Sequence, residues 1–235
     1  MKKSSGFRNN SLLVICLILI FGYSCKKDDN NSLTYETPID QDGNTYKTIK
    51  IGTQTWMAEN LRTTKYRNGD PVGTTIPATK DIQNEETPKY QWPNHGDESA
   101  VVTYGRLYTW YAVHDIRNIA PKGWHVPSSS EWITLITYLG GDSVAGVKMK
   151  ETGENHWNTP NVGATNESGF TAIPTSIRSI EGPFLNVAPH CYWWCSDQYY
   201  TSSGAWVWYL INDDDIVHNG WTPFSAGYSV RCVKD

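Results

Sequence analysis

Residues 120–139 read APKGWHVPSSSEWITLITYL, and they carry the signals of a turn, a short strand and a helix in immediate succession. Pro121 and Gly123 favour a turn. Residues 124–126 (WHV) then read as a short extended piece, which Pro127 ends. This stretch therefore predicts a short strand that is followed directly by the central helix of the scaffold.

The same stretch predicts a helix over residues 128–139. Ser128 offers a hydroxyl to the unpaired amides of a helix start, and Glu131 places a negative charge in the first turn, where the helix dipole favours it. Apolar residues recur at helical spacing along one face: Trp132, Leu135, Ile136 and Leu139. Gly140 follows at the end. We interpret His125 and Glu131 as residues of the scaffold rather than as an acid–base pair.

Residues 1–24 have the pattern of a secretory signal peptide. Lys2, Lys3 and Arg8 precede an apolar run over residues 12–23, which is too short to span a bilayer permanently. Removal of this segment takes away three positive charges and no negative ones, so the net charge falls from −4 to about −7. An acidic mature chain argues against nucleic acid as a partner.

The apolar run ends in GYSC (residues 22–25), which resembles a bacterial lipobox, although Tyr23 is bulkier than the usual residue. We expect cleavage before Cys25 and lipidation of its thiol, which would anchor the chain in a membrane. The alternative is an ordinary secreted protein with an unmodified Cys25. Residues 25–39 are polar and predict a flexible tether. Their KKDD run is similar to signals for the outer face of the cell, so we expect an outer-membrane lipoprotein at the cell surface.

Residues 40–235 form the predicted domain, with helices early and strands late. Residues 104–116 have apolar positions near one helical face, although their aromatic residues would also suit a strand. Residues 66–97 predict long irregular loops. Short strands are expected at residues 170–173, 176–179, 192–195, 205–211, 216–218 and 228–233, with a hairpin turn at residues 212–215.

Six segments in the same order resemble a known family, and together they span the predicted domain. They are residues 49–61 (IKIGTQTWMAENL), 104–110 (YGRLYTW), 120–132 (APKGWHVPSSSEW), 165–174 (TNESGFTAIP), 192–195 (YWWC) and 229–235 (SVRCVKD). The family is the Fibrobacter succinogenes major paralogous domain, common in lipoproteins of Bacteroidota and Fibrobacterota. The resemblance carries no established activity.

The segment GWHVPSSSEW (residues 123–132) and the late RCV (residues 231–233) also resemble the architecture of C-type lectins and of the formylglycine-generating enzyme. That resemblance implies an α+β fold in which two helices pack on a small twisted antiparallel sheet with long loops. Such loops commonly carry binding sites.

Three cysteines remain in the predicted domain. Where the family usually shows WWSS, this chain has WWCS, so Cys195 is a departure. On one straight strand, Cys191 and Cys195 would be about 13 Å apart, beyond disulfide reach. We expect Cys195 to pair with Cys232 across neighbouring strands, with buried free thiols as the alternative. The same separation argues against a metal site made from these cysteines.

We expect a noncatalytic domain that needs no cofactor or metal and that binds a glycan or another surface macromolecule through its loops. Loop-like stretches contain the candidate aromatic platforms: Trp157, Tyr199, Tyr200 and Trp221. Trp132, Trp206 and Trp208 read instead as core residues. Two alternatives stay open: a structural or adhesion protein that packs against envelope partners without a small ligand, and a copper-dependent oxidase resembling the formylglycine-generating enzyme.

Overall fold

Helix α4 (Ser129–Leu139) begins and ends where its local sequence predicts. The computed structural model describes residues 37–185, 187–200 and 203–235. The Ser128 hydroxyl accepts a hydrogen bond from the Glu131 amide at 3.3 Å, and the Glu131 carboxylate accepts one from the Ser128 amide at 2.8 Å. This reciprocal pair satisfies two amides at the helix start. Gly140, at φ 112°, ends the helix in a left-handed conformation.

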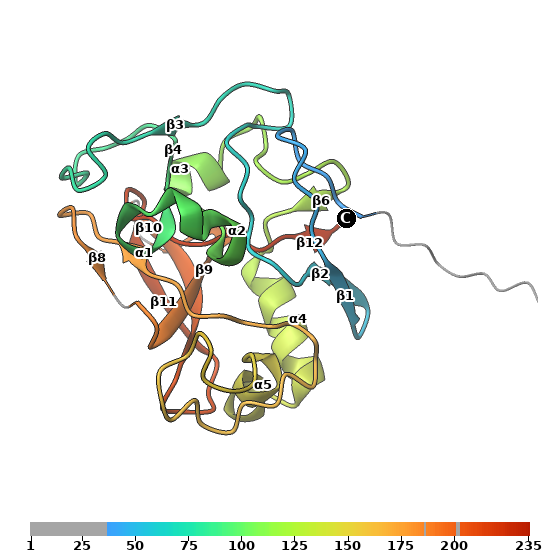
Figure 1. Ribbon diagram of the computed structural model, residues 1–235. Helices are drawn as coiled ribbons and strands as arrows, with labels where there is room; N and C mark the ends of the chain where they lie inside the picture. Colours follow the sequence, from blue (N-terminus) through green and yellow to red (C-terminus); the bar gives the residue numbers. More distant parts are fainter. Residues whose placement is uncertain (1–36, 186, 201–202) are drawn as a thin grey trace, which may run out of the picture. The chain divides into compact units, whose positions relative to one another are not determined.

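Within the described residues the strands form four small sheets, most of them antiparallel (Figure 1). The sheet with the longest strands has the order β11-β10-β9 and consists of β9 (His190–Gln198), β10 (Gly204–Ile211) and β11 (His218–Pro223). A second has the order β1-β2-β12-β6: β1 (Thr48–Ile51), β2 (Gln54–Met57), β12 (Val233–Lys234) and β6 (Trp124–His125). The remaining strands are β3 (Gly73–Thr74), β4 (Lys89–Gln91) and β5 (Leu107–Tyr108) in one sheet, and β7 (Ile177–Arg178) and β8 (Phe184–Leu185) in the other.

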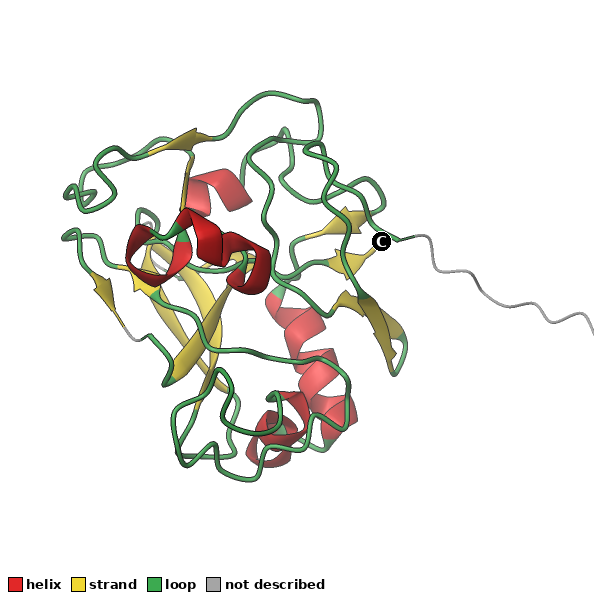
Figure 2. Ribbon diagram, viewed as in Figure 1, coloured by secondary structure: helices red, strands yellow, loops and turns green. Residues whose placement is uncertain are grey.

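The other described helices are short, and long loops connect the elements (Figure 2). They are α1 (Pro93–Gly96), the 3-10 helix η1 (Glu98–Ala100), α2 (Val101–Tyr104), α3 (Trp110–Val113) and α5 (Asp142–Met149). In the described part of the chain, no helix has the length and apolarity needed to cross a membrane. The domain thus combines small, mainly antiparallel sheets with few helices.

Within the helix predicted over residues 104–116, only Tyr104 at the end of α2 and the four residues of α3 (Trp110–Val113) are helical, so the prediction holds only in part. α2 stops at Gly105, whose φ of 77° suits glycine, and the chain then extends through β5. The Tyr108 amide donates to the Tyr228 carbonyl at 2.8 Å, so the extended segment pairs with residues distant in sequence. Tertiary pairing therefore overrides an apolar pattern that local sequence reads as helical.

The predicted boundary between tether and domain also shifts. Ile39 forms a β-bridge with Thr45, and the Tyr46 amide donates to the Pro38 carbonyl at 3.2 Å. Pro38 and Ile39 therefore belong to the folded domain rather than to the tether. The predicted signal peptide and Cys25 lie outside the described residues.

The β9–β10–β11 sheet separates the hydrophobic core into two clusters because the side chains of β10 alternate between its faces. Ala205 and Val207 pack in one cluster, while Trp208 and Leu210 pack in the other, with Trp206 partly buried against it. Both faces of this sheet are therefore covered over its central part.

Trp132 joins α4 to both larger sheets. It is fully buried, with ring centroids 4.9 Å from Trp56 of β2, 5.6 Å from Trp193 of β9 and 6.1 Å from Trp208 of β10. Phe170 completes the group at 6.0 Å. Aromatic pairs at these separations stabilise beyond the area they bury. The apolar face predicted for the helix is the centre of one core cluster.

Arg231 is a buried cation, 1% exposed, that fixes a loop against the core. Its Nε and Nη2 atoms donate to Asn60 Oδ1 at 3.3 and 3.1 Å, and Nη1 donates to the Phe170 carbonyl. Its guanidinium lies 4.2 Å from the Phe170 ring centroid. Trp193 Nε1 donates to the same Asn60 oxygen at 2.9 Å. Burial lowers the pKa of Arg231 to about 9, so this hydrogen-bonding environment must compensate desolvation of the charge.

Lys150 holds three chain segments together. It is 1% exposed, and its ammonium donates to the carbonyls of Val162 at 2.8 Å, Ile211 at 3.2 Å and Asp214 at 2.6 Å. The ring of Trp157 lies 5.9 Å from Nζ. The loop after α5 is thereby attached to the end of β10 and to the hairpin turn that follows it.

His125 connects β6, α4 and the chain's last residue. Its Nδ1 lies 2.7 Å from an Asp235 carboxylate oxygen, and its Nε2 lies 2.7 Å from Glu131. Both ring nitrogens can donate to these carboxylates only when the imidazole is protonated. Burial alone would lower the pKa of His125, but the two hydrogen bonds outweigh it and the pKa is raised. For Glu131, burial favours a higher pKa, yet hydrogen bonds from Ser128 and His125 lower it.

Arg231→Ala should lower the free energy of unfolding by about 4 kcal/mol, because it removes buried packing, two of the donors to Asn60 Oδ1 and the Arg231 donor to the Phe170 carbonyl. Arg231→Lys keeps the charge but not the planar fork, so it should lose most of the same stability. Urea denaturation measures both. The exposed Lys122→Ala is the control, expected within about 0.5 kcal/mol of wild type. A stable Arg231→Lys variant would contradict this role of the fork.

The stabilisation provided by His125 should depend on pH. Because its folded pKa is raised, the contribution is complete below the unfolded value of about 6.5 and is lost as pH rises through the folded pKa. Because the Glu131 pKa is lowered, its contribution is lost as pH falls below about 4.3. The difference in unfolding free energy between wild type and His125→Gln should therefore be larger at about pH 5.5 than at about pH 9. Equal differences at both values would count against the charged pair.

Candidate functional site

The hairpin of β10 and β11 brings two tryptophans together at the sheet surface. Trp206 and Trp221 are directly opposite each other in the register. Trp221 is 50% exposed, whereas Trp206 is partly buried against the core. The edge of the Trp221 ring lies over Gly204, where an added Cβ would come within 2.7 Å of it. Glycine at this position lets the indole lie close to the strand.

Two tyrosines at the end of β9 complete the surface. The Tyr199 ring stacks on Trp221 with centroids 5.3 Å apart and an interplanar angle of 15°, and it meets Trp206 edge-on at 4.8 Å. Tyr200, 88% exposed, lies 5.2 Å from Tyr199 and 5.8 Å from Trp206. We call these four residues the aromatic cluster. The Tyr199 amide donates to the Gly204 carbonyl at 2.9 Å, which fixes the chain at the base of the cluster.

A bulge in β9 links the aromatic cluster to α4. Gln198 pairs with Ala205 and Trp194 with Val207, so residues 195–197 lie opposite Trp206 alone. The bulge turns Asp197 toward the helix start, where its carboxylate accepts a hydrogen bond from the Ser129 amide at 2.6 Å. A carboxylate at this place satisfies an amide and favours the helix dipole.

The candidates named from the sequence include three of the four residues of the aromatic cluster. They also include Trp157, which is not part of it. Tyr199, Tyr200 and Trp221 lie together. Trp157 is only 2% exposed and donates its Nε1 hydrogen to the Ala172 carbonyl at 2.9 Å, so its proposed role as an exposed platform is wrong. The loop that carries Trp157 folds this ring into the core.

Trp206 is the member that sequence reasoning missed, because alternation along its strand assigned it to the core. The turn predicted at residues 212–215 is sufficient to place Trp206 beside Trp221. Trp206 is six residues before this turn and Trp221 six residues after it, so a symmetric hairpin places them opposite each other.

The predicted Cys195–Cys232 disulfide is also wrong. Both thiols are free, as is that of Cys191, and all three are buried. Cys195 lies in one core cluster and Cys232 in the other, and the β9–β10–β11 sheet separates the two clusters. Burial raises the pKa of Cys195 to about 12, and it raises the pKa values of the other two thiols as well. A pair of converging, reactive thiols is therefore not formed by Cys195 and Cys232.

No cluster of three or more His, Cys, Asp or Glu side chains within residues 37–185, 187–200 and 203–235 is arranged to hold a metal ion. The aromatic cluster instead presents exposed ring surfaces, chiefly those of Tyr200 and Trp221.

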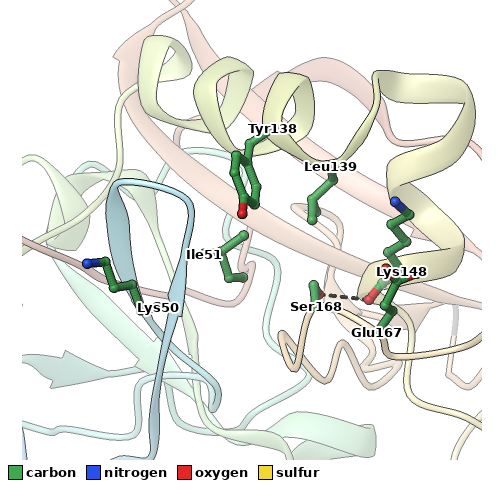
Figure 3. Close-up of a pocket in the computed structure, with 7 residues that line it drawn as sticks. All are labelled: Lys50, Ile51, Tyr138, Leu139, Lys148, Glu167 and Ser168. Atoms are coloured by element: carbon green, nitrogen blue, oxygen red, sulfur yellow. Dashed lines mark hydrogen bonds between the residues drawn. The ribbon is translucent and has the colours of Figure 1, made fainter.

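A separate depression of about 320 Å³ lies between α4, α5 and the β1–β2 hairpin (Figure 3). Its lining consists of Lys50, Ile51, Tyr138, Leu139, Lys148, Glu167 and Ser168. In Figure 3 the Lys50 side chain extends away from the others, while Ser168 donates to the Lys148 carbonyl at 2.7 Å. Tyr138 covers Gly52, where a Cβ would come within 2.8 Å of its ring. Packing and hydrogen bonding within the domain therefore account for the side chains that line this depression. The aromatic cluster remains the stronger candidate for a binding site.

Comparison with known proteins gives a family but no characterised relative. Neither a curated protein sequence nor a solved structure matches this chain. The sequence profile of the Fibrobacter succinogenes major domain matches residues 49–234, which is most of the chain and nearly all of the described domain. The chain therefore belongs to the Fibrobacter succinogenes major domain family.

Proposed function

We propose that this protein is a lipid-anchored cell-envelope protein whose domain binds a glycan without catalysis, through the aromatic cluster. The observation that carries the proposal is the exposed stack of Tyr199 on Trp221, flanked by Tyr200. Large exposed aromatic surfaces are uncommon on soluble domains and mark interaction sites.

The chemistry of the aromatic cluster suits a sugar. One face of a pyranose ring presents C–H groups, and burial of this apolar surface against an aromatic face is favourable, while its hydroxyls remain at the wet edge. Tyrosine and tryptophan supply large contact areas with few rotatable bonds, so little conformational entropy is lost when they are ordered. The Tyr199–Trp221 stack orders both rings before any ligand arrives.

The proposed function also includes anchoring of the domain at the cell envelope. Lipidation at Cys25, a tether after it and placement in the outer membrane, with the domain at the cell surface, would expose the aromatic cluster to envelope or external glycans. The motif GWHVPSSSEW and the packing of α4 on sheets favour a C-type lectin-like arrangement, which places binding surfaces among its loops.

Affinity electrophoresis through gels that contain soluble xylan, mannan, mixed-linkage glucan or dextran would test this function. At least one polysaccharide should retard the protein, and Trp221→Ala should reduce its affinity at least tenfold, since it removes the half-exposed ring on which Tyr199 stacks. Tyr200→Ala should weaken binding in the same gel without loss of stability, because Tyr200 is 88% exposed.

Tyr138→Ala is the matched control, since Tyr138 is 65% exposed but lies outside the aromatic cluster. Its retardation should equal that of the wild type. Retardation that survives Trp221→Ala together with Tyr200→Ala would move the site elsewhere. Failure of all four polysaccharides to retard the wild type would argue for a structural or adhesion role that involves no glycan.

A further inference from the structure

A groove of about 350 Å³ runs between α4 and the β10–β11 hairpin. Its walls come from α4 (Ile133, Ile136 and Thr137), from Asp142 at the start of α5, from Trp208 of β10 and from Asn219 of β11. Trp208, which stacks on Trp132, is 6% exposed, while Ile133 is 55% exposed at the edge. The groove therefore has a rigid aromatic residue in it and an apolar rim on the helix side.

The groove and the aromatic cluster lie next to each other on one face of the sheet. Trp208 is opposite Asn219 in the register, and the next pair on the same face is Trp206 opposite Trp221. From Val217, which lines the groove just before β11, to Trp221 an extended chain spans about 13 Å, which is longer than a single sugar ring. A ligand that lies on Trp221 and continues along the strands would enter this groove.

The polar groups of the groove suit a neutral chain rich in hydroxyls. Asn219 and Thr137 are exposed on opposite walls, and their side chains can both donate and accept hydrogen bonds. Among the described residues that line the groove, Asp142 is the one carboxylate and no side chain is basic, so a polyanion finds no counter-charge there.

One donor in this region also lacks a partner. The Nε1 hydrogen of Trp208 has no acceptor within the described part of the chain. Buried donors of this kind are rare in folded proteins and carry a free-energy cost. The Nε1 hydrogen of Trp132, whose ring stacks on Trp208, also has no acceptor within the described residues, so both stacked indoles share this feature.

We propose that the aromatic cluster and the groove form one extended site that binds an uncharged glycan of several sugar units along the β10–β11 hairpin. This inference rests on the proposed function and adds the class of ligand: a neutral oligosaccharide segment rather than a terminal sugar or an acidic polysaccharide. Trp221 holds one unit, and Asn219, Thr137 and Ile133 contact the units that follow.

Titration with defined oligosaccharides tests chain length. The probes are β-1,4-linked glucose, xylose and mannose oligomers of two to six units, with tetragalacturonate as an acidic comparison, and tryptophan fluorescence reports binding. For at least one neutral series, the Kd of the six-unit oligomer should be about tenfold lower than that of the two-unit oligomer. Tetragalacturonate should bind at least tenfold more weakly than the four-unit member of the same series.

Two groove variants and one matched control locate the effect. Asn219→Ala and Thr137→Trp should each raise the Kd of the six-unit oligomer about fivefold to tenfold and leave that of the two-unit oligomer unchanged. Thr134→Trp, also at an exposed position of α4 but outside the groove, should bind both oligomers like the wild type. Trp221→Ala should weaken both oligomers.

The outcomes separate the two proposals. If the Kd is independent of length, or if Thr137→Trp binds the six-unit oligomer like the wild type, the groove is not part of the site, and the aromatic cluster alone remains the glycan site. A preference for tetragalacturonate would overturn the assignment to neutral glycans. If no oligosaccharide binds and no polysaccharide gel retards the protein, the proposed function itself is wrong.

Discussion

The hydrogen-bonded fork of Arg231 on Asn60 is the interaction on which the two larger sheets most depend. Asn60 follows β2, Arg231 precedes β12, and Trp193 of β9 donates to the same Asn60 oxygen. A buried guanidinium is stable only where carbonyl and amide oxygens surround it and rings pack on its faces. That requirement fixes the loop at Phe170 and, with it, the wall against which Trp132 packs.

A structural feature could be predicted from the sequence where the residues that determine it lie close together in the chain. Helix α4 could be predicted because its cap, apolar face and terminating glycine all lie within fourteen residues. The segment around Tyr108 could not, since its extended form depends on pairing with Tyr228, more than a hundred residues later. Likewise the Arg231 fork joins residues that are 171 apart in the chain, and no local sequence pattern predicts this contact.

The same contrast holds for the candidate site. Expected loop position selects Tyr199, Tyr200 and Trp221, and all three are at least partly exposed, although Trp221 lies within β11 and not in a loop. It misplaced Trp157, since a loop residue can still be buried when the loop folds over a cation such as Lys150. Trp206 shows that strand alternation decides the face of a side chain but not how far the core extends along that face.

The hydrogen bond between Asp197 and Ser129 has a consequence for how a ligand is received. It holds the start of α4 against the bulge in β9, while Trp132, at the end of the first turn, packs the helix against β10. Helix α4 therefore cannot move away from the β10–β11 hairpin unless the hydrogen bond at the start of the helix breaks. Recognition on this face would be a fit to a preformed surface, in which shape selects the ligand and little of the binding free energy is spent on rearranging the protein.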